Sequence, residues 1–288
     1  MTTISDMLID VHSHFWEYPR DFTADFREQA KRAKGGTEFD LTVRYEDYRA
    51  ACRVPVRTVV FGGKAKLSGV WVHDAHVAKY VGAHPDTLIG FLSVDPTQTG
   101  WENELRDGHE ELGLRGIKLL PMYAGFRPDD ERLEPLWKYA TKHRLPVLLH
   151  TGTTFVSQAP LECTLPRHIE PVAIRHPEVK IILAHLGHPY EGECVAVIRK
   201  HPNVYADISA LHYRPFQFYH SLMLVQEYGV WDKVLFGTDY PFTTVDATLD
   251  GLRGLNRMLD GTALPRLDAA KIEALIARDA LPLLGLVG

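Results

Sequence analysis

The sequence predicts a single-domain (β/α)8 TIM barrel, and three observations lead to this prediction. Eight short apolar runs rich in β-branched residues recur along the 288 residues. Stretches with the spacing of one-sided helices follow these runs, and no Ser/Gly-rich linker divides the chain. Alternating strands and helices form a parallel sheet, and eight such strands close a barrel. We therefore expect one domain over residues 1–288.

The expected strands are runs in which Val, Ile and Leu predominate. In chain order they are Met7–His12, Val56–Gly62, Thr87–Asp95, Arg115–Pro121, Pro146–Thr151, Lys180–Leu186, Asn203–Ser209 and Lys233–Asp239. An open doubly wound sheet would fit the same alternation. It would scatter the polar residues at the strand ends, however, whereas a barrel brings them together.

The expected helices place apolar residues three and four positions apart. The clearest are Val72–Ala83, Glu131–His143, Glu191–Lys200 and Phe216–Glu227. We also expect a long first loop from about Phe15 to Asp40, helical spacing without recognisable chemistry over Asp246–Pro265, and a C-terminal helix over Asp268–Leu284.

Three of the joints between a helix and the next strand repeat one device. His84-Pro85, His176-Pro177 and His201-Pro202 each place a histidine at a helix C-terminus, where the dipole favours a cation, and then a proline that cannot extend the helix. We interpret these histidines as structural, because they lie at the end of the barrel that is opposite the usual active site.

Composition excludes several classes of protein. The 32 Lys and Arg residues against 37 Asp and Glu residues give a net charge of −5, so the overall basic excess of a nucleic-acid binder is missing. Cys52, Cys163 and Cys194 lie far apart without a CxxC motif, which argues against a disulfide framework and a zinc ribbon. Without a leader-like start or a long apolar run, we expect a cytoplasmic protein that does not bind membranes.

Histidines stand at the ends of several expected strands. His12 and His14 form an H-x-H pair after the first strand, and residues i and i+2 of a strand share a face. His150, His185 and Asp239 end the fifth, sixth and eighth strands, at the face where a barrel keeps its active site. Each histidine alone could be a core residue whose hydrogen bonds are satisfied. The four histidines and Asp239 together, however, predict a divalent metal site. Zn²⁺ suits these ligands best, with Mn²⁺ and Fe²⁺ as alternatives.

Four motifs resemble those of the amidohydrolase superfamily. They are Asp10-Val11-His12-Ser13-His14, Leu149-His150-Thr151-Gly152, Ala184-His185-Leu186-Gly187 and Phe236-Gly237-Thr238-Asp239-Tyr240-Pro241-Phe242. The closest likeness is to the amidohydrolase-related branch, which contains aminocarboxymuconate-semialdehyde decarboxylase, resorcylate-type decarboxylases, hydrolases and lactonases. The resemblance implies a distorted barrel with a catalytic metal ion.

The resemblance also implies roles for individual residues. It makes His12, His14, His150 and Asp239 metal ligands, with His185 acting on the substrate. Lys118, at the end of the fourth strand, has three interpretations. It could be a carboxylated bridge between two metals, a cation for the substrate, or a strand residue paired with a carboxylate.

Aromatic and cationic residues in the loops after the strands predict the pocket wall. The candidates are Trp16, Tyr123, Arg127, Phe155, Tyr213 and Arg214, with Lys118 as a further substrate contact. Arginine forks bind carboxylates and aromatic faces suit planar molecules, so we expect a small anionic substrate. Alternatively, the arginines pair with surface acids such as Asp129. His188 and Glu17 are expected to be loop residues rather than ligands.

Hydrolysis is the simplest chemistry for such a site, because a bound metal lowers the pKa of water to about 7. Asp239 would take a proton from this water and later protonate the leaving group, and His185 would donate a hydrogen bond to the substrate oxygen. The predicted substrate is a carboxylate-bearing ester, lactone or amide. Non-oxidative decarboxylation is the alternative, a catalytically silent barrel is a third, and the apolar helix faces are compatible with a homodimer.

Overall fold

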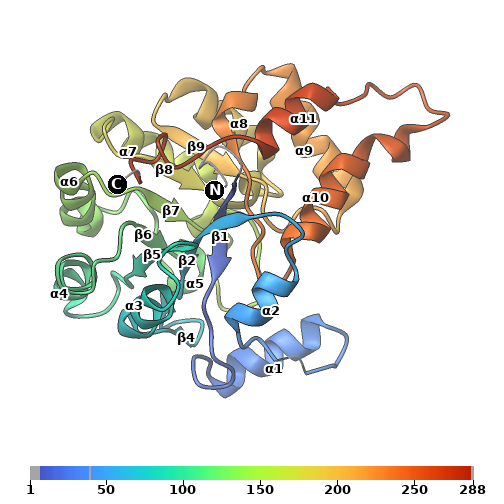
Figure 1. The fold of residues 1–288 in the computed structure, drawn as a ribbon. Helices are drawn as coiled ribbons and strands as arrows, with labels where there is room; N and C mark the ends of the chain where they lie inside the picture. The colour runs from blue at the N-terminus through green and yellow to red at the C-terminus, as the bar shows by residue number, and fades with distance from the viewer. Residues whose placement is uncertain (1–6, 39, 287–288) are drawn as a thin grey trace.

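The computed structural model describes residues 7–38 and 40–286 and places eight parallel strands in one sheet at the centre of the molecule (Figure 1). The sheet order is β1-β2-β5-β6-β7-β8-β9-β10. The bounds are Leu8–His14 (β1), Val56–Phe61 (β2), Leu88–Ser93 (β5), Ile117–Leu119 (β6), Val147–Leu149 (β7), Ile181–Leu183 (β8), Val204–Asp207 (β9) and Val234–Leu235 (β10). Each lies in or overlaps one predicted run, which confirms the predicted strands.

The first and last strands meet and nearly close the barrel. The backbone amide of Val11 donates to the carbonyl of Phe236 at 3.0 Å, and that of Asp239 donates to the carbonyl of His12 at 2.8 Å. An open doubly wound sheet would leave these groups on opposite edges. The barrel prediction is therefore confirmed and the alternative is wrong.

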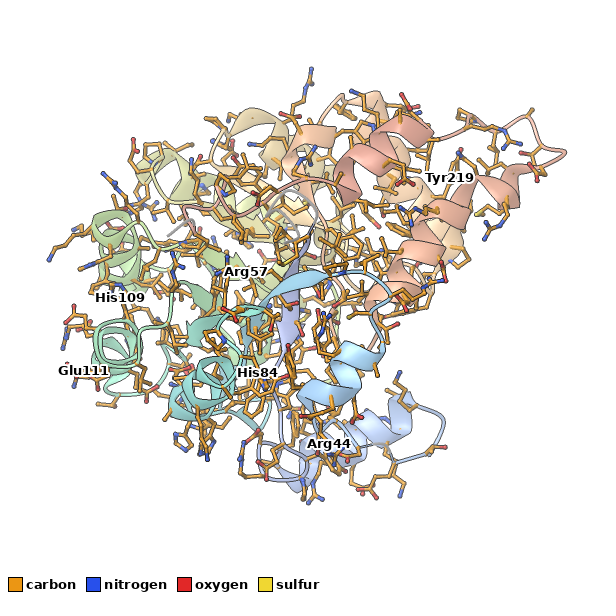
Figure 2. All side chains as sticks on the ribbon, in the orientation of Figure 1. Arg44, Arg57, His84, His109, Glu111 and Tyr219 are labelled. Carbon is orange, nitrogen blue, oxygen red and sulfur yellow. The ribbon has the colours of Figure 1, made fainter. Side chains whose placement is uncertain are left out.

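Helices surround the barrel (Figure 1). The longer ones are α3 (Asp74–Gly82), α6 (Glu134–His143), α8 (Glu191–Lys200), α9 (Pro215–Glu227) and α10 (Val245–Gly254), with α2 (Tyr45–Ala50), α4 (Trp101–Arg106), α5 (Pro121–Ala124) and α7 (Glu170–Arg175) as shorter turns. Arg44 and Glu111, which are labelled in Figure 2, lie on this outer layer and are exposed. Among the described residues, no helix is long and apolar enough to cross a membrane.

Two segments differ from the prediction. The expected first loop contains α1 (Ala24–Ala33), which begins after the Thr23 cap and buries Phe26 and Ala30. Only these few apolar residues mark it, because most of its surface is charged. A short hairpin of β3 (Lys64–Ala65) and β4 (Val70–Trp71) packs nearby and was not predicted either.

The C-terminal helix, α11 (Ala269–Ile276), is shorter than predicted. Further along, Pro282 disfavours helical backbone at Leu281. The segment after α11 runs back across the barrel (Figure 1). Its buried residues, Ala280, Leu281, Leu284 and Leu286, join one apolar cluster with the inward side chains of the strands. Arg278 fixes its course by donating to the carbonyl of Trp231 at 2.8 Å, near the start of β10. This segment, 280–286, is the barrel floor.

Candidate metal centre

A bulge in β1 aims His12 and His14 into the barrel. Ile9 and Val11 belong to the interior cluster, so regular alternation would turn the even-numbered residues outward. The pairing of β1 with β2 shifts between Asp10 and Ser13, however, and one extra residue is accommodated there. Such a bulge reverses the alternation. His12 and His14 therefore face inward, as the H-x-H spacing requires.

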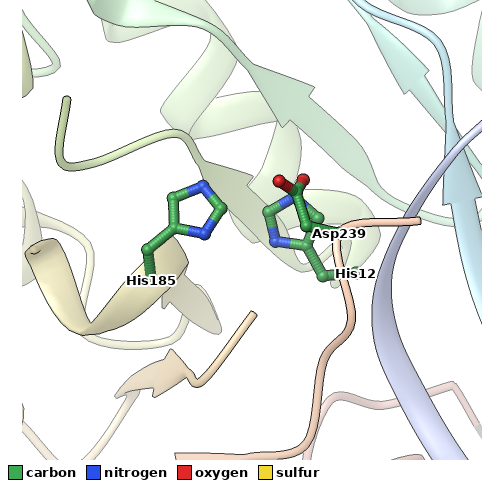
Figure 3. A group of neighbouring side chains, drawn as sticks. All are labelled: His12, His185 and Asp239. Carbon is green, nitrogen blue, oxygen red and sulfur yellow. The ribbon is translucent and has the colours of Figure 1, made fainter. Parts of the chain in front are cut away.

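The two histidines converge on one oxygen atom of Asp239. Oδ1 of this carboxylate lies 3.2 Å from Nε2 of His12 and 3.0 Å from Nε2 of His14. Among the described residues, His12, His185 and Asp239 form a group whose potential metal-binding atoms all lie within 4.8 Å of one another (Figure 3). Four of the five predicted strand-end residues, His12, His14, His185 and Asp239, thus come together in the fold.

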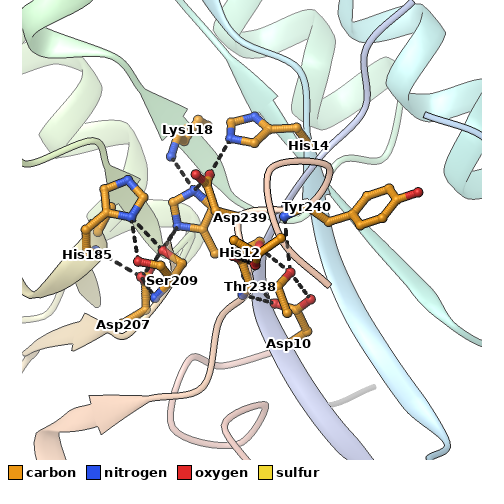
Figure 4. A network of polar contacts seen from close by, with 12 residues as sticks. Asp10, His12, His14, Lys118, His185, Asp207, Ser209, Thr238, Asp239 and Tyr240 are labelled. Atoms are coloured by element: carbon orange, nitrogen blue, oxygen red, sulfur yellow. Dashed lines mark hydrogen bonds and ion pairs between the residues drawn. The ribbon is translucent and has the colours of Figure 1, made fainter. Parts of the chain in front are cut away.

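Asp207 and Ser209, which follow one another across the end of β9, orient two of these imidazoles (Figure 4). Nδ1 of His12 lies 2.9 Å from Oδ2 of Asp207, and Nδ1 of His185 lies 3.0 Å from the carbonyl oxygen of Ser209. Both acceptors require a proton on Nδ1, so Nε2 of each neutral ring carries a lone pair. Sequence reasoning missed both residues, although their position at the end of the seventh predicted strand was a usable signal.

Asp10 ties the first strand to the last one beside the site. Its carboxylate accepts from the backbone amide of Thr238 at 3.0 Å, from Oγ1 of Thr238 at 2.7 Å and from the amide of His12 at 3.1 Å. Burial raises the pKa of Asp10 to about 6, against these hydrogen bonds. Asp10 therefore fixes the backbone from which His12 and Asp239 project.

The backbone is strained where the site residues leave the strands. His185, Ala210 and Asp239 have φ angles of 58°, 58° and 69°, in the left-handed region that residues other than glycine rarely adopt. Hydrogen bonds hold the two site residues there: the amide of His185 donates to Asp207 at 3.0 Å, and that of Asp239 donates to the carbonyl of His12. Strain of this kind gathers at functional sites.

His150 ends β7 beside this group. Its ring centroid lies 5.2 Å from that of His185 and 4.9 Å from that of Tyr123. Its Nε2 atom is buried and has no hydrogen-bond partner in the described structure. Because a buried polar atom without a partner is costly, this nitrogen is a strong candidate to bind something that the protein itself does not supply.

Burial sets the charge states of the site. It lowers the pKa of His14 and of His185 to about 4 and that of His150 well below its usual range, so these rings are neutral at pH 7. Burial alone would raise the pKa of Asp239, but the adjacent imidazoles of His12 and His14 hold it well below its usual range. Three neutral imidazoles therefore face an ionised carboxylate, which is the form in which these groups bind metals.

Lys118 is fully buried beside the group. Its Nζ atom lies 3.4 Å from Nε2 of His12 and 4.2 Å from the ring centroid of Phe61. Burial lowers the pKa of its amine to about 7. No carboxylate of the described residues lies within ion-pair distance of Lys118. The interpretation as a strand residue paired with a carboxylate is therefore wrong.

A cavity of about 690 Å³ opens beside Asp239 and His185. Four of the predicted substrate contacts line it, namely Tyr123, Phe155, Tyr213 and Arg214. His150 also lines it. Sequence reasoning did not predict the other lining residues, which come mainly from loops that only the fold brings together: Ala33, Lys34, Thr153, Thr154, His188, Ala210, Leu211, His212 and Phe242.

Three predicted substrate contacts do not line the cavity: Lys118, which is buried beside the histidines, and Trp16 and Arg127, which lie elsewhere. Trp16 stacks on His14 with the ring centroids 4.0 Å apart, and its Nε1 donates to the carbonyl of Gly62 at 3.2 Å. Arg127 points to solvent and donates to Asp129 at 2.9 and 2.6 Å, as the surface-pair alternative anticipated. Trp16 therefore supports His14 from behind, and neither residue lines the cavity.

Comparison with known proteins places the chain in a family. The model of the amidohydrolase family matches residues 9–283, so the chain belongs to this family. No curated protein sequence matches the chain. Membership of this family identifies it as an enzyme of the amidohydrolase type.

Solved structures share the fold over almost the whole length. An uncharacterised TIM-barrel protein from Bordetella bronchiseptica is 21% identical, with a TM-score of 0.69, and covers 97% of this chain and 99% of its own. A probable 2-pyrone-4,6-dicarboxylic acid hydrolase from Acinetobacter baumannii with bound citric acid is 15% identical, with a TM-score of 0.63, and covers 96% and 99%. A dihydroxybenzoic acid decarboxylase from Polaromonas, with bound manganese and 2-nitroresorcinol, is 18% identical, with a TM-score of 0.59, and covers 98% and 97%.

Proposed function

We propose that this amidohydrolase is a metal-dependent enzyme that hydrolyses a small, planar, carboxylate-bearing ester, lactone or amide. The observation that carries the proposal is the set of imidazoles gathered around one ionised carboxylate at the edge of a cavity. Decarboxylation of a small aromatic or unsaturated acid is the second candidate. The solved relatives include both kinds of enzyme and do not favour hydrolysis.

The side chains fit a divalent ion. Two ligands at roughly 2.0–2.2 Å from one ion lie roughly 3.0–3.5 Å from each other at tetrahedral or octahedral angles. The separations of 3.2 and 3.0 Å between Asp239 and the two histidines match this spacing. Moreover, the lone pair that Asp207 leaves on Nε2 of His12 faces an ionised oxygen, and a cation between them relieves the repulsion.

We assign the ligands as His12, His14, His150 and Asp239. His185 lies close enough to bind as well, but His150 has a buried nitrogen without a partner and His185 does not. We therefore assign His185 to the substrate. A solved relative carries manganese, so manganese stands beside zinc as the candidate metal. Lys118 faces the same group and is either a substrate cation or a bridge to a second metal.

When bound, the ion would polarise a substrate oxygen and lower the pKa of water. Asp239 is ionised and would accept the proton that the attacking water loses. His185 has its Nδ1 proton engaged by Ser209, so its Nε2 faces the site as an acceptor. The hydrogen bond that we expected His185 to donate to the substrate therefore requires that the ring first gain a proton.

The cavity wall supports an anionic, planar substrate. Tyr123, Phe155 and Tyr213 offer aromatic faces, and Arg214 stands on the same wall. The guanidinium of Arg214 lies over the Tyr213 ring at 4.6 Å and has no carboxylate partner among the described residues. An arginine held in this way is suited to bind a carboxylate of the substrate.

Hydrolysis is preferred over decarboxylation on one feature of the sequence. After His150 the chain reads Thr151-Gly152-Thr153-Thr154-Phe155, without the Gly-rich stretch ending in proline that family decarboxylases usually carry. Thr153, Thr154 and Phe155 line the cavity, so the difference lies at the substrate.

The free thiols of Cys52, Cys163 and Cys194 support our expectation of a reducing, cytoplasmic setting. A homodimer stays a prediction.

The test is the metal content of the purified, untagged protein, measured by mass spectrometry beside a His12→Ala/His14→Ala variant. We expect about one transition metal per chain, which the variant loses. A value near two would identify Lys118 as a bridge. Protein loaded with zinc or manganese is then screened against carboxylated lactones, esters, amides and hydroxybenzoates. Acid release supports hydrolysis and CO₂ release supports decarboxylation. A wild type that neither holds nor takes up metal contradicts the proposal.

A further inference from the structure

A second pair of polar side chains faces the cavity from outside the proposed ligand set. His188 follows His185 by three residues in the loop after β8, and its Nδ1 lies 2.6 Å from Oε1 of Glu191. The two side chains are only 8% and 7% exposed. His188 nevertheless lines the cavity together with Asp239 and His185. We expected His188 to be an inert loop residue, but the fold gives it a buried carboxylate partner and an opening to the cavity.

Glu191 is held as a negatively charged acceptor. It is the first residue of α8, where the helix dipole favours an anion. Oγ of Ser221, on α9, donates to the same Oε1 atom at 3.1 Å. Burial would raise the pKa of Glu191, but the hydrogen bond with His188 and those from the backbone and Ser221 lower it. An ionised Glu191 keeps a proton on Nδ1 of His188, so Nε2 is the nitrogen that exchanges a proton with other molecules.

Close packing of two loops holds the backbone of His188 against Gly152. A Cβ atom at Gly152 would lie 2.5 Å from the carbonyl oxygen of His188, and Gly152 has a φ angle of 114°. Only glycine permits this approach. The backbone amide of His188 also donates to the carbonyl of His185 at 2.9 Å. The position of the imidazole is therefore set by the same strand ends that carry the site.

Asp239 could protonate the leaving group once it has taken the proton of water, but neither assigned residue holds a proton in the resting site. Asp239 is ionised, and His185 presents a lone pair to the site. Resting on the proposed function, we propose that His188 is a catalytic acid–base residue of this enzyme and that Glu191 positions it. A carboxylate behind an imidazole serves this purpose in many enzymes, because it fixes the tautomer and stabilises the imidazolium.

The proton balance is closed in either reaction. In hydrolysis, water adds its oxygen to the acyl carbon and gives a proton to Asp239. His188 gives its Nε2 proton to the leaving oxygen or nitrogen as that bond breaks, and the proton on Asp239 is returned to His188 through solvent. In decarboxylation, CO₂ leaves, the bonding electron pair stays on the substrate carbon, and His188 supplies the proton that this carbon gains.

The test compares His188→Gln and Glu191→Gln with a matched control in the metal-loaded full chain. The control is His176→Gln, because His176 is equally buried and lies 3.2 Å from Glu134, but at the other end of the barrel. We expect all three variants to keep their metal and their melting temperature within a few degrees. With the substrate found in the screen, we expect His188→Gln to lower kcat about 10²- to 10⁴-fold with little change in KM.

The remaining outcomes are as follows. Glu191→Gln should lower kcat by about tenfold, imidazole in the buffer should partly restore the kcat of His188→Gly, and His176→Gln should behave as wild type. A His188→Gln enzyme with wild-type kcat overturns the proposal. If the wild type turns over nothing in the screen, the proposed function fails separately. The role of His188 is then tested by the rate at which diethyl pyrocarbonate modifies it. His188 should react faster than His176, and more slowly in Glu191→Gln; reaction no faster than that of His176 overturns the proposal.

Discussion

Histidines stand at both ends of this barrel, and their surroundings differ. At the N-terminal ends of the strands, the histidines have separate neighbours: His84 stacks on Tyr45 with the centroids 3.5 Å apart, His176 pairs with Glu134, and Nε2 of His201 lies 3.8 Å from Glu170. At the C-terminal ends, several histidines converge on Asp239. The residue type is the same, so convergence on one carboxylate, rather than the number of histidines, indicates a site.

The largest expected effect is at the point of convergence. Asp239→Asn removes the negative charge that faces the imidazoles and the proton acceptor of the proposed reaction. We expect kcat/KM to fall about 10³- to 10⁴-fold, measured with the substrate found in the screen. His176→Gln, at the other end, should leave kcat/KM unchanged. Comparable losses in both variants would break the distinction between the two ends.

The opposite pattern is expected at the barrel floor, residues 280–286. Leu284 is fully buried in the interior cluster. Leu284→Ala should lower the free energy of unfolding by about 2–5 kcal/mol, because it removes buried apolar surface and leaves a cavity. Urea unfolding measures this loss, and a metal titration of the folded variant should give wild-type affinity. If the variant had normal stability but bound the metal more weakly, the barrel floor would contribute to the metal site and not only to stability.

A smaller effect is expected behind the proposed ligands. Asp207→Asn keeps the shape of the side chain but loses the charge that holds the Nδ1 proton of His12. We expect metal affinity to fall about 10- to 100-fold, measured by competition with a chromophoric chelator. Unchanged affinity would mean that Asp207 only supports the fold. The comparison would then rest on Asp239 and the imidazoles.

The smallest effect concerns pH at the N-terminal end. Burial lowers the pKa of Lys233 from 10.5 to about 8, although its Nζ donates to the carbonyl of Pro202 at 2.7 Å. Between these two values the unfolded chain binds more protons than the folded chain, so stability rises with pH from 8 to 10.5. Because Lys233 is half-exposed, we expect a rise on the order of 1 kcal/mol. Lys233→Met should lack this rise in urea unfolding curves collected across that range.

Local patterns in the sequence predicted the strands and the strand-end residues. The runs around Val147 and Ile181 reveal strands because β-branched residues cluster there, and His150 and His185 follow directly. The bulge in β1 could not be predicted, because it depends on pairing with β2. The H-x-H spacing correctly predicted that His12 and His14 share one face of the strand, but it could not predict whether that face points into the barrel.

The missed features all depend on contacts between distant segments. Asp207 and Ser209 acquire their roles only when β9 lies between β8 and β10. The pair of His188 and Glu191 is local in sequence, but only the cavity gives it significance. The barrel floor was predicted as helix because its leucines recur at helical spacing, whereas tertiary packing and Pro282 decide its conformation.

The hydrogen bonds that Thr238 donates to Asp10 join residues that are 228 positions apart. During synthesis on the ribosome, the first strand therefore emerges long before its last neighbour exists. Until then the imidazoles of β1 lack the carboxylate that completes the site, and no partial chain can bind a metal ion through the full ligand set. We therefore expect the protein to bind its metal late in biogenesis. A metal ion in a purified sample would indicate that the barrel has closed.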